Sequence, residues 1–209
     1  MQERVVLPLR EESPSERFIR AEAGVSSIAP WVTSAVIEGK TSRIGDYYPD
    51  PANPATAIGV VFSVSSDGKS GKIVSLDEGR ELQWSSESGN FGATSDDNGQ
   101  ANTNAIKTYK QNNPTSTITF PSFEWCINKG TRWYLPAKDE LLALYSQKVA
   151  VNAALAGIGS ATQLSNRWYW SSSEYVPYNN LAWLISFSNG NADYDYKLAR
   201  PSVRAVSAF

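Results

Sequence analysis

The chain has 209 residues, a formal net charge of −2 at pH 7, 41% hydrophobic residues and 11% aromatic residues. This composition is typical of a folded protein with one large or two small domains, and it provides no overall positive field for nucleic acid or an anionic membrane. The chain has no histidine and a single cysteine, Cys126. These counts exclude histidine general bases, Ser–His and Cys–His pairs, histidine-ligated zinc, intrachain disulfides and CxxC sites.

Residues 1–43 differ from the rest of the chain. They contain the charged clusters 10–12 and 16–20, three prolines and short apolar runs. We interpret this part as an N-terminal extension or attachment segment with one or two strands, and a partly ordered tail is an equally good interpretation. The first residues lack the apolar core of a secretory signal peptide. No stretch approaches the ~20 apolar residues that a membrane-spanning helix needs.

The following part begins with a proline-rich loop at 44–57 and then predicts a β-hairpin. The strands of the hairpin, 58–64 and 72–76, are rich in Val and Ile, and the polar stretch 65–68 between them ends in Asp-Gly. A polar and glycine-rich stretch, 85–99, predicts a long loop.

Helices are predicted next, at 102–109 and, shorter, at 123–126. The clearest helix begins at Pro136, because the N–H that proline lacks would have no partner in a first helical turn. A second helical piece, 149–156, ends before Gly157, a residue type that suits the position after a helix.

Short strands follow to the C-terminus. In 181–187 small or apolar residues alternate, with Ala182, Leu184 and Ser186 predicted on one face. An Asn-Gly pair predicts a turn into a strand at 193–197, and a last strand is predicted at 202–206. Together these elements predict an α+β fold with short antiparallel strands, two or three helices and long ordered loops.

The stretch between residues 175 and 202 is a mixture of Tyr, Asn, Ser and Asp that would make a poor core. It suits a contact surface, because Tyr covers a large area at low entropic cost while Asn, Ser and Asp adapt their hydrogen bonds. We therefore expect the rest of the chain to hold this stretch still and present it.

Several motifs in a fixed order carry a family resemblance. WYLPAKDEL at 133–141 resembles the helix start of the formylglycine-generating-enzyme type of C-type lectin fold. Together with YWSSSEY at 169–175 and VRAV at 203–206, it looks like the variable proteins of diversity-generating retroelements and their relatives in gut Bacteroidales and phages. The resemblance covers residues 44–209 and implies one C-type lectin-like domain of that subtype.

In that family a reverse transcriptase mutates adenines, so Asn codons change into many others. Between residues 175 and 202 only Trp183 and Lys197 are types that such a codon cannot reach. The resemblance implies a framework of Trp170, Glu174, Trp183, Phe187, Gly190, Lys197 and Arg204, with Lys197 and Arg204 bonded to Glu174 or to backbone carbonyls. It implies that the variable, ligand-facing residues are Tyr175, Tyr178, Asn179, Asn180, Leu184, Ser186, Ala192, Asp193, Tyr194, Asp195, Tyr196, Leu198, Ala199, Arg200 and Ser202.

We expect no catalysis and no cofactor. Formylglycine-generating enzymes hold copper with two cysteines, and this chain has one, which we expect to be a buried apolar residue. The carboxylate pairs Asp96-Asp97, Asp139-Glu140 and Asp193/Asp195 each fit an ordinary place, in a loop, at a helix N-terminus and on an exposed strand. Calcium binding by Asp96, Asp97 and Asn98 is chemically conceivable, but their spacing is not that of an EF-hand.

These observations predict a receptor-recognition or adhesion protein that acts at the cell surface, outside the cell or on a virion. Its partner would be a protein or glycan on another cell or particle, and neither nucleic acid nor an inserted membrane segment is expected. The alternative is a structural or assembly subunit of a phage tail or surface fibre, attached through residues 1–43, and homo-oligomers fit either function. A hydrolase or oxidase has no supporting set of residues.

Overall fold

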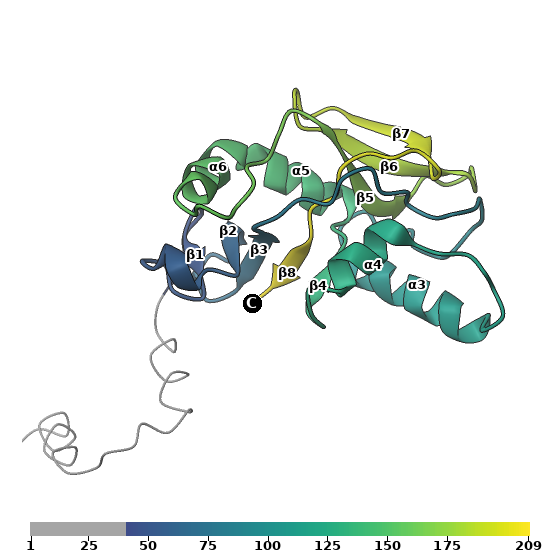
Figure 1. The fold of residues 1–209 in the computed structure, drawn as a ribbon, viewed down its shortest axis with the longest axis horizontal. Coiled ribbons are helices and arrows are strands. Elements are labelled where there is room, and N and C mark those ends of the chain that lie inside the picture. The colour runs from purple at the N-terminus through teal and green to yellow at the C-terminus, as the bar shows by residue number, and fades with distance from the viewer. Residues whose placement is uncertain (1–40) are drawn as a thin grey trace, which may run out of the picture. The chain divides into compact units, whose positions relative to one another are not determined.

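Two antiparallel sheets and the helices beside them build the part of the protein that the computed structural model describes, residues 41–209 (Figure 1). The strands are β1 (Tyr47–Tyr48), β2 (Gly59–Val64), β3 (Gly71–Ser75), β4 (Trp133–Tyr134), β5 (Trp168–Glu174), β6 (Leu181–Ser186), β7 (Ala192–Tyr196) and β8 (Val206–Ala208). The helices are η1 (Pro54–Thr56), α3 (Gly99–Asn112), α4 (Pro121–Ile127), α5 (Lys138–Ser146) and α6 (Lys148–Ala156). The predicted α+β class is confirmed.

The five-stranded sheet has the order β1-β2-β3-β8-β4 and the three-stranded sheet the order β5-β6-β7. The C-terminal strand β8 therefore lies between β3 and β4, although both of these strands are far from β8 in sequence. The predicted extension, 1–43, lies outside the described residues except for its last three, so the division into 1–43 and 44–209 stays a prediction. Within the described residues no helix is long and apolar enough to cross a lipid bilayer.

Side-chain hydrogen bonds to backbone N–H groups determine where α3 and α5 begin. The Asn98 side chain accepts a hydrogen bond from the Ala101 N–H at 2.9 Å, so α3 begins before the predicted position. Helix α5 begins at Lys138, two residues after Pro136, because the Glu140 carboxylate reaches back to the Ala137 N–H at 2.8 Å. Such a bond satisfies a backbone donor that no helical carbonyl can reach.

The predicted last strand, 202–206, is wrong in position. Ser202 and Val203 form single bridges to Tyr169 and Gly79, two different segments, and the regular strand starts only at Val206. A strand needs consecutive pairing with one neighbour, and this part of the backbone divides its hydrogen bonds between two.

Two apolar clusters lie on either side of β6. One contains Phe62, Leu141 and Ile185, and the other contains Trp84, Phe123, Cys126, Trp170 and Leu184. Cys126 is fully buried, as predicted, and its burial raises the pKa of its thiol. Each buried Leu, Ile or Phe contributes about 1.5–3 kcal/mol relative to an exposed one. Because both faces of β6 are covered, only one end of β6 and the neighbouring β7 reach the surface.

Candidate functional site: an aromatic surface at the sheet edge

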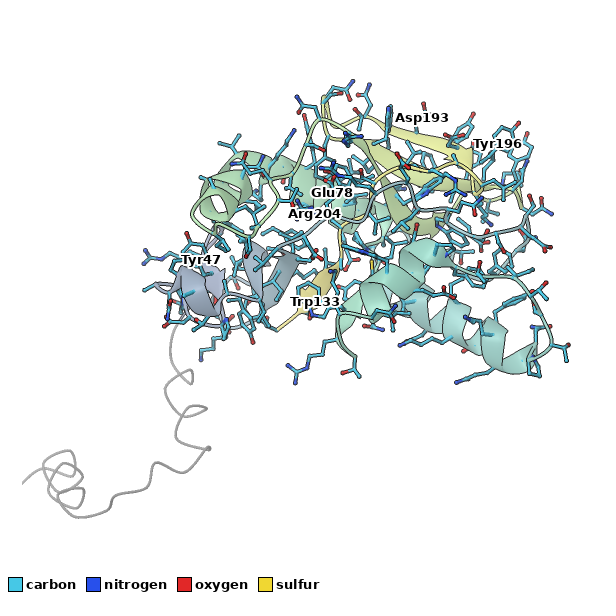
Figure 2. The ribbon with its side chains drawn as sticks, viewed as in Figure 1. Tyr47, Glu78, Trp133, Asp193, Tyr196 and Arg204 are labelled. Carbon is cyan, nitrogen blue, oxygen red and sulfur yellow. The ribbon has the colours of Figure 1, made fainter. Side chains whose placement is uncertain are left out.

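The structure places the residues predicted to face a ligand in three environments. Eight are exposed, namely Tyr178, Asn179, Ala192, Asp193, Tyr194, Tyr196, Leu198 and Arg200, and four are half-buried, namely Tyr175, Asn180, Asp195 and Ala199. Asp193 and Tyr196 are labelled on β7 in Figure 2, far from Tyr47 on β1.

The other three residues are buried, which corrects the prediction for them. Leu184 packs in the cluster of Trp170, the Ser186 hydroxyl shares a 2.7 Å hydrogen bond with the Ser188 hydroxyl, and Ser202 pairs with Tyr169 through its backbone. Leu184 and Ser186 project from the face of β6 that also carries Ala182, and Ala182 and Leu184 of this face pack into that cluster. Leu184 and Ser186 therefore do not face a ligand at the exposed surface, and Ser202 keeps only 5% of its surface accessible.

Four aromatic side chains cluster at the exposed end of the three-stranded sheet. The ring of Tyr175 lies 4.1 Å from that of Tyr194 and 6.0 Å from that of Tyr178, with interplanar angles of 19° and 5°. Trp183 meets Tyr175 edge-on at 4.9 Å. We call these four residues together with Tyr196 the tyrosine surface. Offset and edge-on contacts between rings contribute about 0.5–1.5 kcal/mol per pair beyond the area they bury, so the surface is partly preorganised.

Strand pairing sets this arrangement. Tyr194 stands opposite Trp183 in the β6–β7 register, and Tyr196 stands opposite Leu181. Side chains opposite each other in an antiparallel pair share a face, so Tyr194 and Tyr196 lie on the same side of β7. The loop between β5 and β6 adds Tyr178, whose N–H donates to the Tyr175 carbonyl at 3.0 Å. The surface remains open, since Tyr178 is 58% exposed, Tyr194 46% and Tyr196 61%.

A buried ion pair lies beneath the tyrosine surface. The Lys197 ammonium contacts the Glu174 carboxylate at 2.6 Å, and neither side chain is accessible to more than a trace of solvent. Lys197 also donates to the carbonyls of Gly89 and Asn179, while Glu174 accepts from the N–H groups of Phe91 and Ala93. Burial lowers the pKa of Lys197, and the bond and charge of Glu174 oppose this shift. The pair therefore ties the loop before α3, the β5–β6 loop and the end of β7 to one point.

Arg204 has a similar role at the other end of the tail. Its guanidinium donates to the carbonyls of Ser75 at 2.8 Å and Asp77 at 3.0 Å, and also to the carbonyl of Thr162. Figure 2 shows it beside Glu78. Burial lowers the pKa of Arg204, and the nearby negative charges act against that shift. The prediction that Lys197 and Arg204 are framework residues bonded to Glu174 and to backbone carbonyls is confirmed.

The carboxylates of β7 serve their own strand. Inter-strand bonds from Ser186 to Asn191 and from Lys197 to Asn180 show that the odd-numbered residues of β7 direct their backbone towards β6. The N–H groups of Tyr194 and Tyr196 therefore face away from β6. Asp193 accepts the first at 2.8 Å and Asp195 the second at 2.7 Å. The two aspartates thus satisfy outward-facing N–H groups of an edge strand, and this role is sufficient to explain their presence.

The conceivable calcium ligands are also used locally. Asp96 pairs with the Lys138 ammonium at 2.6 Å, Asp97 accepts from the Ser95 hydroxyl at 2.8 Å, and Asn98 caps α3. In residues 41–209 no group of three or more His, Cys, Asp or Glu side chains is arranged to hold a metal ion. The Asp139 and Glu140 pair lies in the first turn of α5, where Glu140 is buried and bonded to Tyr134.

Comparison with known proteins decides the family. Residues 73–207, well over half of the chain, match the Lcl C-terminal domain. The chain belongs to this family. The matched range begins inside β3 and ends inside β8, so the Lcl C-terminal domain includes the tyrosine surface, the buried ion pair and Arg204. A search of curated proteins found no significant match.

A solved structure shares the fold. A fimbrial protein from Bacteroides ovatus ATCC 8483 superposes with a TM-score of 0.60 at 17% sequence identity, over 80% of this chain. The chain covers 49% of that protein, so it spans about half its length. At this identity the likeness concerns the fold alone.

Proposed function

We propose that this Lcl C-terminal domain is a non-catalytic ligand-binding protein that recognises a protein or glycan on another cell or particle through its tyrosine surface. The observation that carries the proposal is a stack of exposed and half-buried aromatic rings on a framework anchored by buried charges. Exposed Tyr and Trp side chains are the residue types that dominate binding energy in protein interfaces. A surface or extracellular location fits such a function, and so does the fold shared with a fimbrial protein.

We further propose that the surface is diversified, as the resemblance to variable proteins of diversity-generating retroelements and their C-type lectin-like fold implies. The exposed and half-buried candidates other than Ala199, which packs against the cluster of Trp170, are the residues in which exchange leaves the two apolar clusters intact. This part of the proposal has a direct test in the neighbouring DNA. An adenine-rich near-copy of the codons for residues 169–206 beside a reverse transcriptase gene would support it, and a genome without either would overturn it.

Binding is tested with the triple variant Y178A/Y194A/Y196A of the full chain. We expect its melting temperature to change little, because the three side chains are 46–61% exposed, while binding of the labelled protein to a glycan array and to intact bacterial cells is lost. The control is V149A, which removes an 87% exposed apolar side chain outside the surface. If the triple variant unfolds, or binds as the parent does, the tyrosine surface is not the binding site.

A second candidate is an assembly subunit of a surface fibre or phage tail. It is favoured by the likeness to a fimbrial protein of about twice the matched length. In that case deletion of residues 1–43 would abolish assembly and leave 44–209 folded. The two functions are separable, because the triple tyrosine variant would still assemble.

A further inference from the structure

A second concave site lies at the far end of β5 from the tyrosine surface. It is a pocket of about 340 Å³ whose wall includes Arg80, Arg167, Arg200 and Trp168. Trp168 begins β5, whereas Glu174, beneath the tyrosine surface, ends it. Seven residues of extended strand span roughly 20 Å, so one compact ligand cannot reach both sites.

The pocket concentrates positive charge in a chain whose net charge is −2. Its lining includes three arginines and one acidic residue, Glu81. Arg80 uses its Nε to contact the Glu78 carboxylate at 3.0 Å, and Arg200 donates to the Glu81 carbonyl at 3.3 Å. Arg167 is exposed, and within residues 41–209 its side chain has no hydrogen bond or ion pair. Guanidinium donors therefore remain for a ligand.

A buried network holds the pocket wall in place. Glu78, whose side chain is 1% exposed, accepts the Tyr169 hydroxyl as well as Arg80. The backbone of Glu81 has a φ of +55°, a left-handed conformation that is uncommon for a residue other than glycine. That conformation places the Glu81 carbonyl where Arg200 reaches it. Residues held in strained conformations occur often at ligand sites, because the surrounding structure must fix them.

Trp168 gives the pocket a flat apolar wall. Its side chain is 40% exposed, while the next residue, Tyr169, is fully buried and fixes the start of β5. A partly exposed indole in a pocket lining suits a ligand that has an apolar face of its own. The backbone edge beside it is closed, because Trp168 and Trp170 exchange hydrogen bonds with Ser202. An extended peptide therefore finds no free strand edge here to pair with.

We propose that this pocket binds a sugar ring that carries a carboxylate. The carboxylate would bind Arg167 and Arg200, since a guanidinium matches a carboxylate with two parallel hydrogen bonds. The C–H face of the ring would stack on Trp168. A volume of about 340 Å³ lies at the lower end of the range for small-molecule sites, which fits a single ring rather than a long chain. This site shares none of the five residues of the tyrosine surface. Arg200 is also one of the candidate variable residues, so the pocket requires that Arg200 stay fixed even where the tyrosine surface is diversified.

The test is a titration of the full chain with N-acetylneuraminic acid and with glucuronic acid, followed by saturation-transfer NMR. We expect binding in the millimolar range, and the methyl ester of glucuronic acid and glucose should bind at least about tenfold more weakly, because they lack the charge that the arginines recognise. R167A and W168A should each weaken binding of the acids about tenfold or more. The control R43A removes an exposed arginine outside the pocket and should leave binding unchanged.

Three results would overturn the proposal. The first is equal binding of the acid and its methyl ester. The second is unchanged binding in both R167A and W168A while their circular dichroism spectra show a folded protein. The third is binding of heparin, but not of the single sugars, that persists in W168A, which would indicate a general electrostatic surface instead of a pocket. Because Arg167 and Trp168 are partly exposed, both variants should fold.

Discussion

The tyrosine surface and the framework residues Lys197 and Arg204 are neighbours in the C-terminal tail, but they differ in burial and in what holds them. Tyr196 is 61% exposed, and the next residue, Lys197, is completely buried. The surface residues are held by ring contacts with one another and by the pairing of their own strand. Most of the hydrogen bonds of the Lys197 and Arg204 side chains reach segments more than forty residues away in sequence. The framework does not use the exposed side chains, so it can stay fixed while they change.

We expect the largest loss of stability when one of the buried framework charges is removed. K197M leaves the Glu174 carboxylate buried without its counter-ion and releases the carbonyls of Gly89 and Asn179. We expect a loss of about 3–5 kcal/mol in the free energy of unfolding, as for other broken buried pairs. Denaturant titration followed by fluorescence measures it.

The matched control for this change is K110A. Lys110 pairs with Glu124 at 2.7 Å, but both side chains are well exposed, so we expect a change of about 0–1 kcal/mol. Equal effects of K197M and K110A would show that the buried pair does not anchor the surface.

A substitution in the turn between β6 and β7 should cause a smaller loss of stability. Gly190 has a φ of +80°, and a Cβ at this position would collide with the Tyr145 ring. G190A should therefore cost about 1–3 kcal/mol, from backbone strain together with overpacking. G159A is the control, because a Cβ added to Gly159 would have no atom within 4 Å and the φ of this glycine is not positive. A loss in G159A as large as that in G190A would contradict this explanation, with melting temperatures as the measurement.

The five-stranded sheet contains a tyrosine that should make stability depend on pH. Burial, and then the negative charge of Glu140, raise the pKa of Tyr134 above its ordinary value of about 10. The folded protein keeps this proton where the unfolded chain releases it, so the contribution of Tyr134 is complete below pH ~10 and is lost as the pH rises further.

Y134F removes this titration. We expect it to cost about 1–2 kcal/mol near pH 7, because the 2.8 Å bond to Glu140 is lost. Above pH ~10 the unfolding free energy should fall less steeply than in the parent, by up to about 1.4 kcal/mol per pH unit. Burial raises the pKa of Tyr169 and Cys126 too, so part of the alkaline loss should remain. Parallel curves for the two proteins would show that Tyr134 does not titrate abnormally.

The sequence is sufficient to predict those features that depend on neighbours along the chain. The hairpin β2–β3, the Asn-Gly turn at Gly190 and the pairing of Lys197 with Glu174 follow from residue types at short range or from the resemblance to a known family. The burial of Leu184 and Ser186 does not follow, because alternation in β6 suggests one solvent-facing side, and only the tertiary structure covers both.

The arginine pocket could not be predicted for a related reason. Arg80, Arg167 and Arg200 come from three segments far apart in sequence, and each alone reads as an ordinary exposed charge. Nothing local distinguishes them from Arg43 or Arg132. The stacking of Tyr175 on Tyr194 has the same origin, because it depends on the β6–β7 register and on the path of the β5–β6 loop. Trp183, expected to be only framework, joins that stack for this reason.

The smallest expected effect on stability concerns the edge of β7 itself. D193A/D195A removes the acceptors of the outward-facing N–H groups of Tyr194 and Tyr196, which water can then satisfy. We therefore expect the unfolding free energy to change by no more than about 0.5 kcal/mol. Self-association should increase, because an uncapped edge strand without charges can pair with another chain. Light scattering after size-exclusion chromatography measures this, with D50A, which removes a single aspartate from a loop outside β7, as the control. If the double variant self-associates no more than D50A, the two aspartates are solvated surface charges that do not protect the edge of β7 from pairing with another chain.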